Sequence, residues 1–218
     1  MNLAVVAPAV LGLTWVVAVA RRAPDGALLS ATRTVAGGAV AFAAAWWGYA
    51  LLDQLGLRIS WDDLTAGGRG SVVAAAAIGL VEESAKLVGL ALSSVGARSG
   101  RGQVLRRILG VSAVFASLEC AFTLSGAGAT VILLRAAFAP IAHAALALPL
   151  GLAIAGGRLS PGRALPALAV AVLLHGASDL ALAIPSVGRL GYAVILSAPV
   201  VALHLRTRVL WARAARAA

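Results

Sequence analysis

Long uncharged apolar runs, separated by short polar connectors, recur along the whole chain. A run of about 20 apolar residues is long enough to cross the hydrocarbon core of a bilayer as an α-helix. The pattern predicts about seven such spans in an all-α, polytopic transmembrane bundle. We place them at Asn2–Ala20, Thr34–Leu55, Ser71–Val95, Arg107–Ser125, Thr130–Ala155, Ala164–Ile184 and Leu190–Leu205. No second domain or repeat interrupts the pattern, so residues 1–218 are interpreted as one integral-membrane domain.

Composition supports this reading and excludes an ordinary soluble domain. Hydrophobic residues make up 61% of the chain and charged residues 12%. The net charge of +10 does not indicate nucleic-acid binding, because the Arg residues cluster in connectors, where they set topology and contact anionic lipids. Arg greatly outnumbers Lys and Ala is abundant, as is typical of GC-rich bacterial genomes. We therefore expect a multi-pass protein of the bacterial inner membrane.

Orientation follows from the side on which the basic residues fall. Roughly thirteen lie on one side, including Arg21, Arg22, Arg106 and Arg107, against three on the other. Because basic residues concentrate in cytoplasmic connectors, we expect a cytoplasmic C-terminus and an N-terminus outside. The first run has no basic segment before it, unlike a signal peptide, so we expect it to remain as a span.

Ionisable residues inside the predicted spans point to a functional site. A charged side chain at membrane depth costs about 2.5–3.5 kcal/mol on insertion scales, so such residues mark function by default. Apart from residues at the ends of spans, such as the interfacial His204, they fall on spans three to six, in a polar core at about residues 71–184: Glu82, Glu83, Lys86, Glu119, Arg135, His143, His175 and Asp179. Glu82, His143 and His175 are predicted near the midplane. Glu119 and Arg135, at similar depth on neighbouring spans, are predicted to form an ion pair.

Carboxylates near imidazoles in a low-dielectric cavity suit hydrolysis. A buried Glu can act as general base on water, while a His shares the water or protonates the leaving amine. A second His with Asp179 can donate to the oxyanion, and Asp179 does so only when protonated. Lys86 would keep one carboxylate ionised and oriented. The residues leave open which of Glu82 and Glu83 is the base.

The same residues carry a family resemblance. The run Glu82–Lys86 resembles the EExxK motif of the PrsW-type intramembrane proteases, which look like a branch of the superfamily of CAAX-prenyl proteases and bacteriocin-processing enzymes. The later order is also similar: Glu119 in a Phe-flanked helix, Arg135 followed by His143, and His175 with an acidic residue four positions later. The resemblance covers about Ile78 to Asp179.

The resemblance implies a glutamate-type protease without a metal cofactor. It implies that Glu82 or Glu83 activates water, that His143 assists, and that His175 lies near the oxyanion. Its substrates would be membrane-anchored proteins rather than prenylated tails. The family often has Asn where this chain has Asp179, and an acid that must stay protonated implies activity that falls at high pH.

Three other functions fit parts of the pattern. Two His and a Glu could hold the zinc ion of an intramembrane metalloprotease, although no HExxH spacing is present. Glu, His and Asp chains also relay protons in transporters, but the inverted repeats typical of transporters are absent from the sequence. A non-catalytic membrane scaffold would tolerate Glu82→Gln with little loss.

Overall fold

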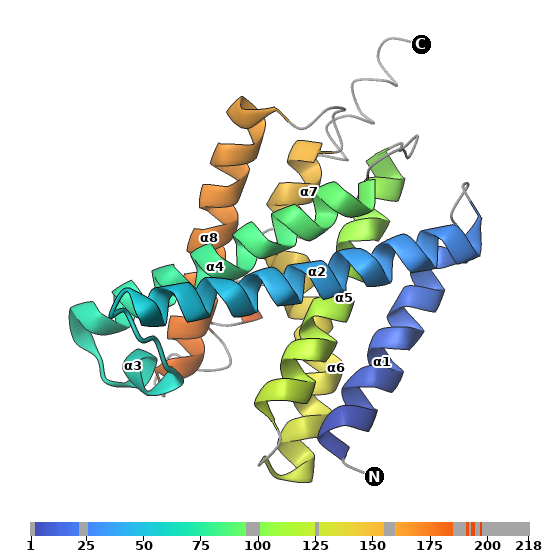
Figure 1. The fold of residues 1–218 in the computed structure, drawn as a ribbon. Helices are drawn as coiled ribbons and strands as arrows, with labels where there is room; N and C mark the ends of the chain where they lie inside the picture. Colours follow the sequence, from blue (N-terminus) through green and yellow to red (C-terminus); the bar gives the residue numbers. More distant parts are fainter. Residues whose placement is uncertain are drawn as a thin grey trace.

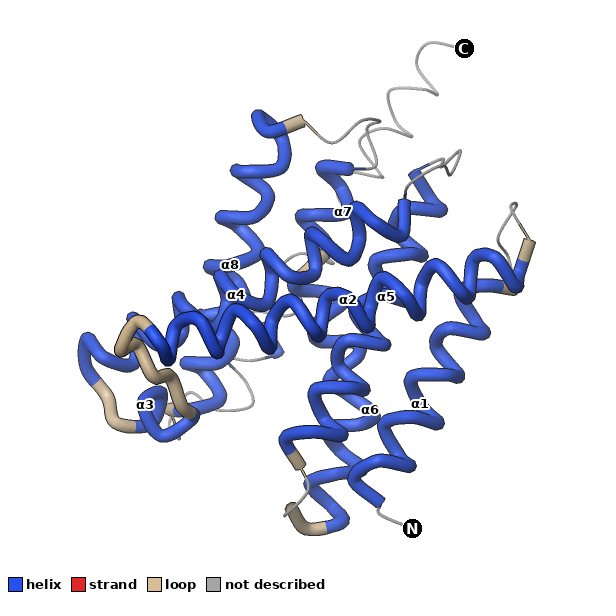
Figure 2. The backbone as a smooth tube through the Cα atoms, in the orientation of Figure 1, coloured by secondary structure: helices blue, strands red, loops and turns tan. Residues whose placement is uncertain are grey.

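The structure is a computed structural model that describes residues 3–21, 26–94, 101–124, 127–154 and 160–184, together with Gly191, Ala193, Val194 and Ser197. Helices are the only regular structure in this part of the chain, so the predicted all-α class is confirmed (Figures 1 and 2). The helices are α1 (Leu3–Ala20), α2 (Ala27–Gln54), α3 (Trp61–Thr65), α4 (Gly68–Ser94), α5 (Arg101–Thr123), α6 (Ala129–Leu146), α7 (Leu148–Ile154) and α8 (Pro161–Ala183).

Most helices match the predicted runs, with one correction. The run predicted as a single helix over Thr130–Ala155 is divided at Ala147 into α6 and α7. Pro149 has no backbone N–H and cannot bond the carbonyl four residues earlier, so the helix is interrupted just before it. The predicted run Leu190–Leu205 lies almost entirely outside the described residues.

Three of the described helices are long and apolar enough to cross a membrane. They are Leu28–Gln54 within α2, α6 and α8. Helix α4 is of similar length but carries Glu82, Glu83 and Lys86 in its second half, which is where the apolar pattern breaks. The three candidate spans indicate a membrane protein.

Helix α4 lies at the centre of the bundle, packed between α2 and α8 (Figure 1). Glycines allow both contacts to be close. A Cβ added to Gly37 on α2 would lie 2.7 Å from the Gly89 carbonyl oxygen on α4. A Cβ on Gly79 would lie 2.7 Å from the Val172 carbonyl oxygen on α8. Small residues at helix contacts are typical of membrane bundles, where close backbone approach replaces the hydrophobic effect as the source of stability.

The connector between α2 and α4 folds back over the bundle as the short helix α3. Its start is capped by Asp63, whose Oδ2 accepts hydrogen bonds from the Ser60 hydroxyl at 2.8 Å and the Ser60 backbone N–H at 2.7 Å. These bonds hold the pKa of Asp63 below its ordinary value. Leu64 is buried against Ala74 and Ala75 of α4, so the connector is fixed over the beginning of that helix.

Candidate functional site

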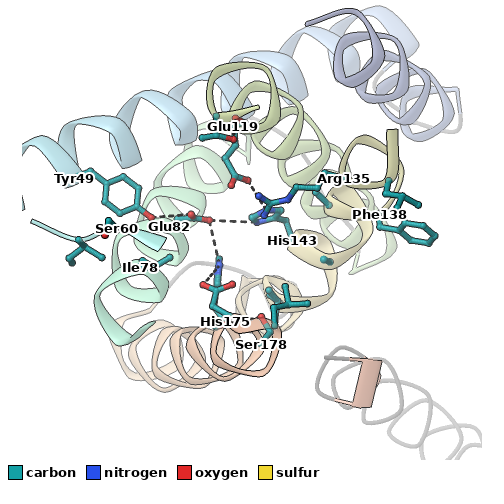
Figure 3. A pocket seen from close by; sticks show the side chains of 18 residues that line it. Tyr49, Ser60, Ile78, Glu82, Glu119, Arg135, Phe138, His143, His175 and Ser178 are labelled. Atoms are coloured by element: carbon teal, nitrogen blue, oxygen red, sulfur yellow. Dashed lines mark hydrogen bonds and ion pairs between the residues drawn. The ribbon is translucent and has the colours of Figure 1, made fainter. Parts of the chain in front are cut away.

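Four helices bring the candidate residues to one place. Glu82, Glu83 and Lys86 come from α4, Glu119 from α5, His143 from α6, and His175 with Asp179 from α8. Glu82, Glu83, Lys86, His143 and His175 are all buried. The sequence predicts that these helices share a polar core, and the structure places the side chains within contact distance of one another (Figure 3).

Glu83 holds two other side chains of this cluster in place through hydrogen bonds. Its side chain is fully buried, and its Oε1 accepts hydrogen bonds from Lys86 Nζ at 2.7 Å and from His175 Nδ1 at 2.7 Å. Because a carboxylate can only accept, His175 carries a proton on Nδ1. The other ring nitrogen of His175 is therefore directed elsewhere, and Nε2 lies 3.6 Å from both Glu82 Oε2 and Asp179 Oδ2.

Lys86 determines which ring nitrogen of His143 carries the proton. Its Nζ lies 2.9 Å from His143 Nδ1. An ammonium has no lone pair, so Lys86 donates and His143 Nδ1 accepts. A neutral His143 then carries its proton on Nε2, which lies 3.0 Å from Glu119 Oε2. Lys86 thus connects Glu83 to His143, and through His143 to the carboxylate on α5.

Glu82 differs from Glu83 in the surroundings of its second oxygen, because in both residues Oε2 is buried without a hydrogen-bond partner among the described residues. Glu82 Oε1 accepts a hydrogen bond from the Tyr49 hydroxyl at 3.0 Å. Oε2 has no hydrogen-bond partner among the described residues, although it is buried. It lies 3.6 Å from each of three nitrogens: Lys86 Nζ, His143 Nδ1 and His175 Nε2. A small polar molecule seated there would meet one acceptor and several ring or ammonium nitrogens (Figure 3).

Glu82 borders a cavity of about 620 Å³. His143, His175, Asp179, Glu119 and Arg135 also line it, whereas Glu83 and Lys86 lie behind this surface. Apolar side chains of α6 and α8, among them Phe138, Ala142 and Leu182, form much of the remaining wall. Both glutamates are thus close to the two imidazoles, but only Glu82 can touch a molecule in the cavity.

The predicted ion pair between Glu119 and Arg135 is not formed. Both residues line the cavity, but no nitrogen of Arg135 lies within 4.0 Å of the Glu119 carboxylate in the structure. Glu119 is instead directed to His143. The sequence predicts that the two residues lie at a similar depth on neighbouring helices. The rotation of each helix about its axis, however, decides which side chains meet.

Tyr49 is the site residue that the sequence reading missed. Its neighbours Trp46 and Trp47 are exposed on the outside of α2, as is typical of aromatic residues at a membrane interface. Tyr49, however, follows Ala41 and Ala45 at helical spacing, and those two small residues are buried against α4 and α5. This stripe of small residues was the available signal that Tyr49 points inward.

Three side chains of the cluster are of the types that bind metal ions. Glu82, His143 and His175 each offer a ligand atom, and these atoms lie within 4.8 Å of one another. A bound zinc would require nitrogen ligands at about 2.0–2.1 Å. The Lys86 ammonium already lies 2.9 Å from His143 Nδ1 and 3.6 Å from Glu82 Oε2. In this arrangement the lone pair of His143 Nδ1 accepts from the Lys86 ammonium, so this nitrogen would bind a metal ion only after Lys86 moved away.

No protein-family model, no curated protein and no solved structure matches this chain. The geometry of the described residues shows a buried cluster of Glu82, His143 and His175 in a helical protein with candidate membrane spans.

Proposed function

We propose that this protein is an intramembrane endopeptidase of the glutamate type, similar to the PrsW-type proteases. The observation that carries the proposal is Glu82, which lines the cavity and whose Oε2 is a buried carboxylate oxygen without a hydrogen-bond partner among the described residues, 3.6 Å from two imidazole nitrogens. A carboxylate held in this way can accept a proton from water, as a general base must.

The reaction divides the residues by role. Glu82 takes a proton from a water molecule, and the resulting hydroxide attacks the carbonyl carbon of the scissile peptide bond. The oxyanion forms on the carbonyl oxygen, and two cavity-lining groups can donate to it: His175 Nε2 when the ring is an imidazolium that carries a proton on both nitrogens, and Asp179 when its carboxyl is protonated. The C–N bond then breaks, and the leaving nitrogen takes the proton from Glu82. His143 borders the same water position.

Glu83 and Lys86 act as positioning residues in this account. Glu83 holds His175 through Nδ1, and Lys86 holds His143 through Nδ1. Neither residue lines the cavity. The choice of base that the sequence leaves open therefore falls on Glu82.

Topology suggests from which side substrate arrives. We propose seven spans with the N-terminus outside and the C-terminus cytoplasmic, in a bacterial inner membrane. The cavity wall comes from the outer ends of α2, α5 and α8 and from Ile59 and Ser60 of the outer connector. Toward the cytoplasmic end, the bundle is filled by a packed cluster that includes Leu90, Ile108 and Leu150. Water and a membrane-anchored protein substrate would enter from the outer half of the membrane.

A zinc-dependent protease is the second candidate, because Glu82, His143 and His175 could hold an ion if the Lys86 side chain moved away. In that case the three residues would be ligands, and the metal would supply an activated water. The Lys86 contact favours the metal-free reading.

Proteolysis in reconstituted vesicles tests the proposal. Wild type and the variants Glu82→Gln and His143→Ala are offered a panel of single-span membrane proteins, with and without a strong zinc chelator. Trp47→Phe, on the exposed side of α2, is the matched control. Cleavage that resists the chelator and is lost in both site variants supports a glutamate protease. Loss on chelation that zinc restores supports the metalloprotease, and flux of ions without cleavage supports a transporter.

A further inference from the structure

Arg135 is a charged residue of the cavity that the proposed reaction does not use. It lies on α6 and lines the cavity. The other charged groups of the wall have close contacts: Glu82 accepts from Tyr49, Glu119 lies 3.0 Å from His143, and Asp179 lies 3.6 Å from His175. Within the described part of the chain, Arg135 has no carboxylate within 4.0 Å.

A guanidinium at membrane depth is stabilised by a counter-ion. Ionisable residues in spans almost always pair with one another, with backbone carbonyls or with a ligand. The nearest helix offers Glu119, but that carboxylate is directed to His143. The group that completes the Arg135 site is therefore expected to come from the molecule that occupies the cavity.

Helix geometry gives the distance along α6 between the backbone positions of Arg135 and His143. Arg135 and His143 are eight residues apart on α6 and both line the cavity, so about 12 Å of helix separates them. Ala139 and Ala142 lie between them on the cavity wall, and their small side chains leave room along this face. An extended peptide covers about 3.3 Å per residue, so three to four residues span the interval.

We propose that Arg135 is a specificity-determining residue that binds a carboxylate of the substrate, three to four residues from the cleaved bond and toward the outer end of the cavity. The favoured substrate is thus a membrane-anchored peptide with Asp or Glu at that distance. A guanidinium forms two parallel hydrogen bonds to a carboxylate, which a Lys cannot reproduce. The inference rests on the proposed function, because the position of the substrate carboxylate is counted from the scissile bond.

Matched peptides test this assignment. Single-span peptides carry Glu, or Gln as the neutral control, at each position from two to six residues on either side of the cleavage point. Wild type should cleave the peptide with Glu at three or four residues at least tenfold faster, at low substrate, than its Gln counterpart. Arg135→Gln should lose that preference and Arg135→Lys should retain part of it. Arg58→Gln, on an exposed connector at the same side, should keep it.

Binding separates this inference from the proposed function. Affinities of the same Glu and Gln peptides are measured for the Glu82→Gln variant, with and without Arg135→Gln, so that no cleavage is needed. An Arg135-dependent preference for the Glu peptide supports the site whether or not the protein is a protease. Equal affinities for both peptides overturn the inference. So does an effect of Arg135→Gln that is the same for both peptides and requires anionic lipid in the vesicles, since that result identifies a lipid site.

Discussion

Nδ1 of His175 on α8 donates to Glu83 Oε1 on α4, at 2.7 Å and with both side chains buried. This bond joins helices from distant parts of the sequence and fixes which ring nitrogen of His175 faces the cavity. The same oxygen also accepts from Lys86. Glu83 Oε1 therefore binds two side chains and Glu83 does not line the cavity, whereas the adjacent Glu82 does.

The two glutamates should respond differently to the same substitution. Glu83→Gln leaves the Lys86 ammonium without its closest counter-ion, and breaking a buried ion pair typically costs about 3–5 kcal/mol. We expect a lower melting temperature together with lower activity. Glu82→Gln keeps an amide oxygen that can accept from Tyr49, so its melting temperature should stay close to that of wild type. Thermal unfolding of both variants in detergent checks this. Equal destabilisation by the two changes would contradict the division of roles.

Tyr49→Phe should reduce catalysis without weakening substrate binding. The hydroxyl donates to Glu82 Oε1, and a hydrogen bond to a charged group contributes about 1.5–3 kcal/mol. Without it, Glu82 can rotate and Oε2 no longer keeps its place beside the imidazoles. We expect kcat to fall about tenfold or more, with KM within twofold. Steady-state kinetics provide the measurement, with Trp47→Phe as control. A change in KM alone would indicate that Tyr49 contacts the substrate instead.

Gly79→Ala should disturb the site through the helix contact. Its Cβ would lie 2.7 Å from a backbone oxygen of α8 and 3.3 Å from the Cβ of His175, so the two helices must separate. The bond between Glu83 and His175 depends on that approach. We expect both stability and activity to fall. Gly70→Ala, on the same helix with no atom within 4 Å of the added Cβ, should leave both unchanged. Full activity in Gly79→Ala would show that close approach is not needed.

Asp179→Asn should change the dependence of activity on pH. If Asp179 donates to the oxyanion, wild-type activity falls as pH rises and the carboxyl loses its proton. An amide donates at every pH, so the variant should keep its activity where that of wild type declines. Rates of wild type and variant between pH 6 and 10 make the comparison. Parallel profiles for the two proteins would assign the donor role to another group.

The apolar pattern was enough to predict the all-α class and most of the helices, because span length is set by the bilayer. It was also enough to gather Glu82, Glu83, His143 and His175 as site candidates, because ionisable residues at that depth are rare. The single span predicted over Thr130–Ala155 does not separate α6 from α7 at Ala147, although Pro149 within it indicates a kink. Proline is often tolerated within membrane helices, so its effect depends on the neighbouring helices.

The sequence alone does not predict which side chains of the site contact each other. Glu119 and Arg135 were assigned to each other by depth, but the rotation of α5 and α6 directs Glu119 to His143. Glu82 and Glu83 are adjacent and chemically identical, and only the packing of α2 and α8 distinguishes them. Tyr49 on α2 meets one, and His175 on α8 meets the other.

In the proposed reaction, Glu82 activates the water that cleaves the peptide bond. The most direct measurement is the single-turnover cleavage rate of Glu82→Gln in chelator-treated vesicles, compared with wild type and after its fold has been verified by thermal unfolding. Loss of a general base lowers the rate by about 10²–10⁴-fold, and we predict a loss in this range. A Glu82→Gln protein that folds normally and cleaves within a few-fold of the wild-type rate would contradict the account.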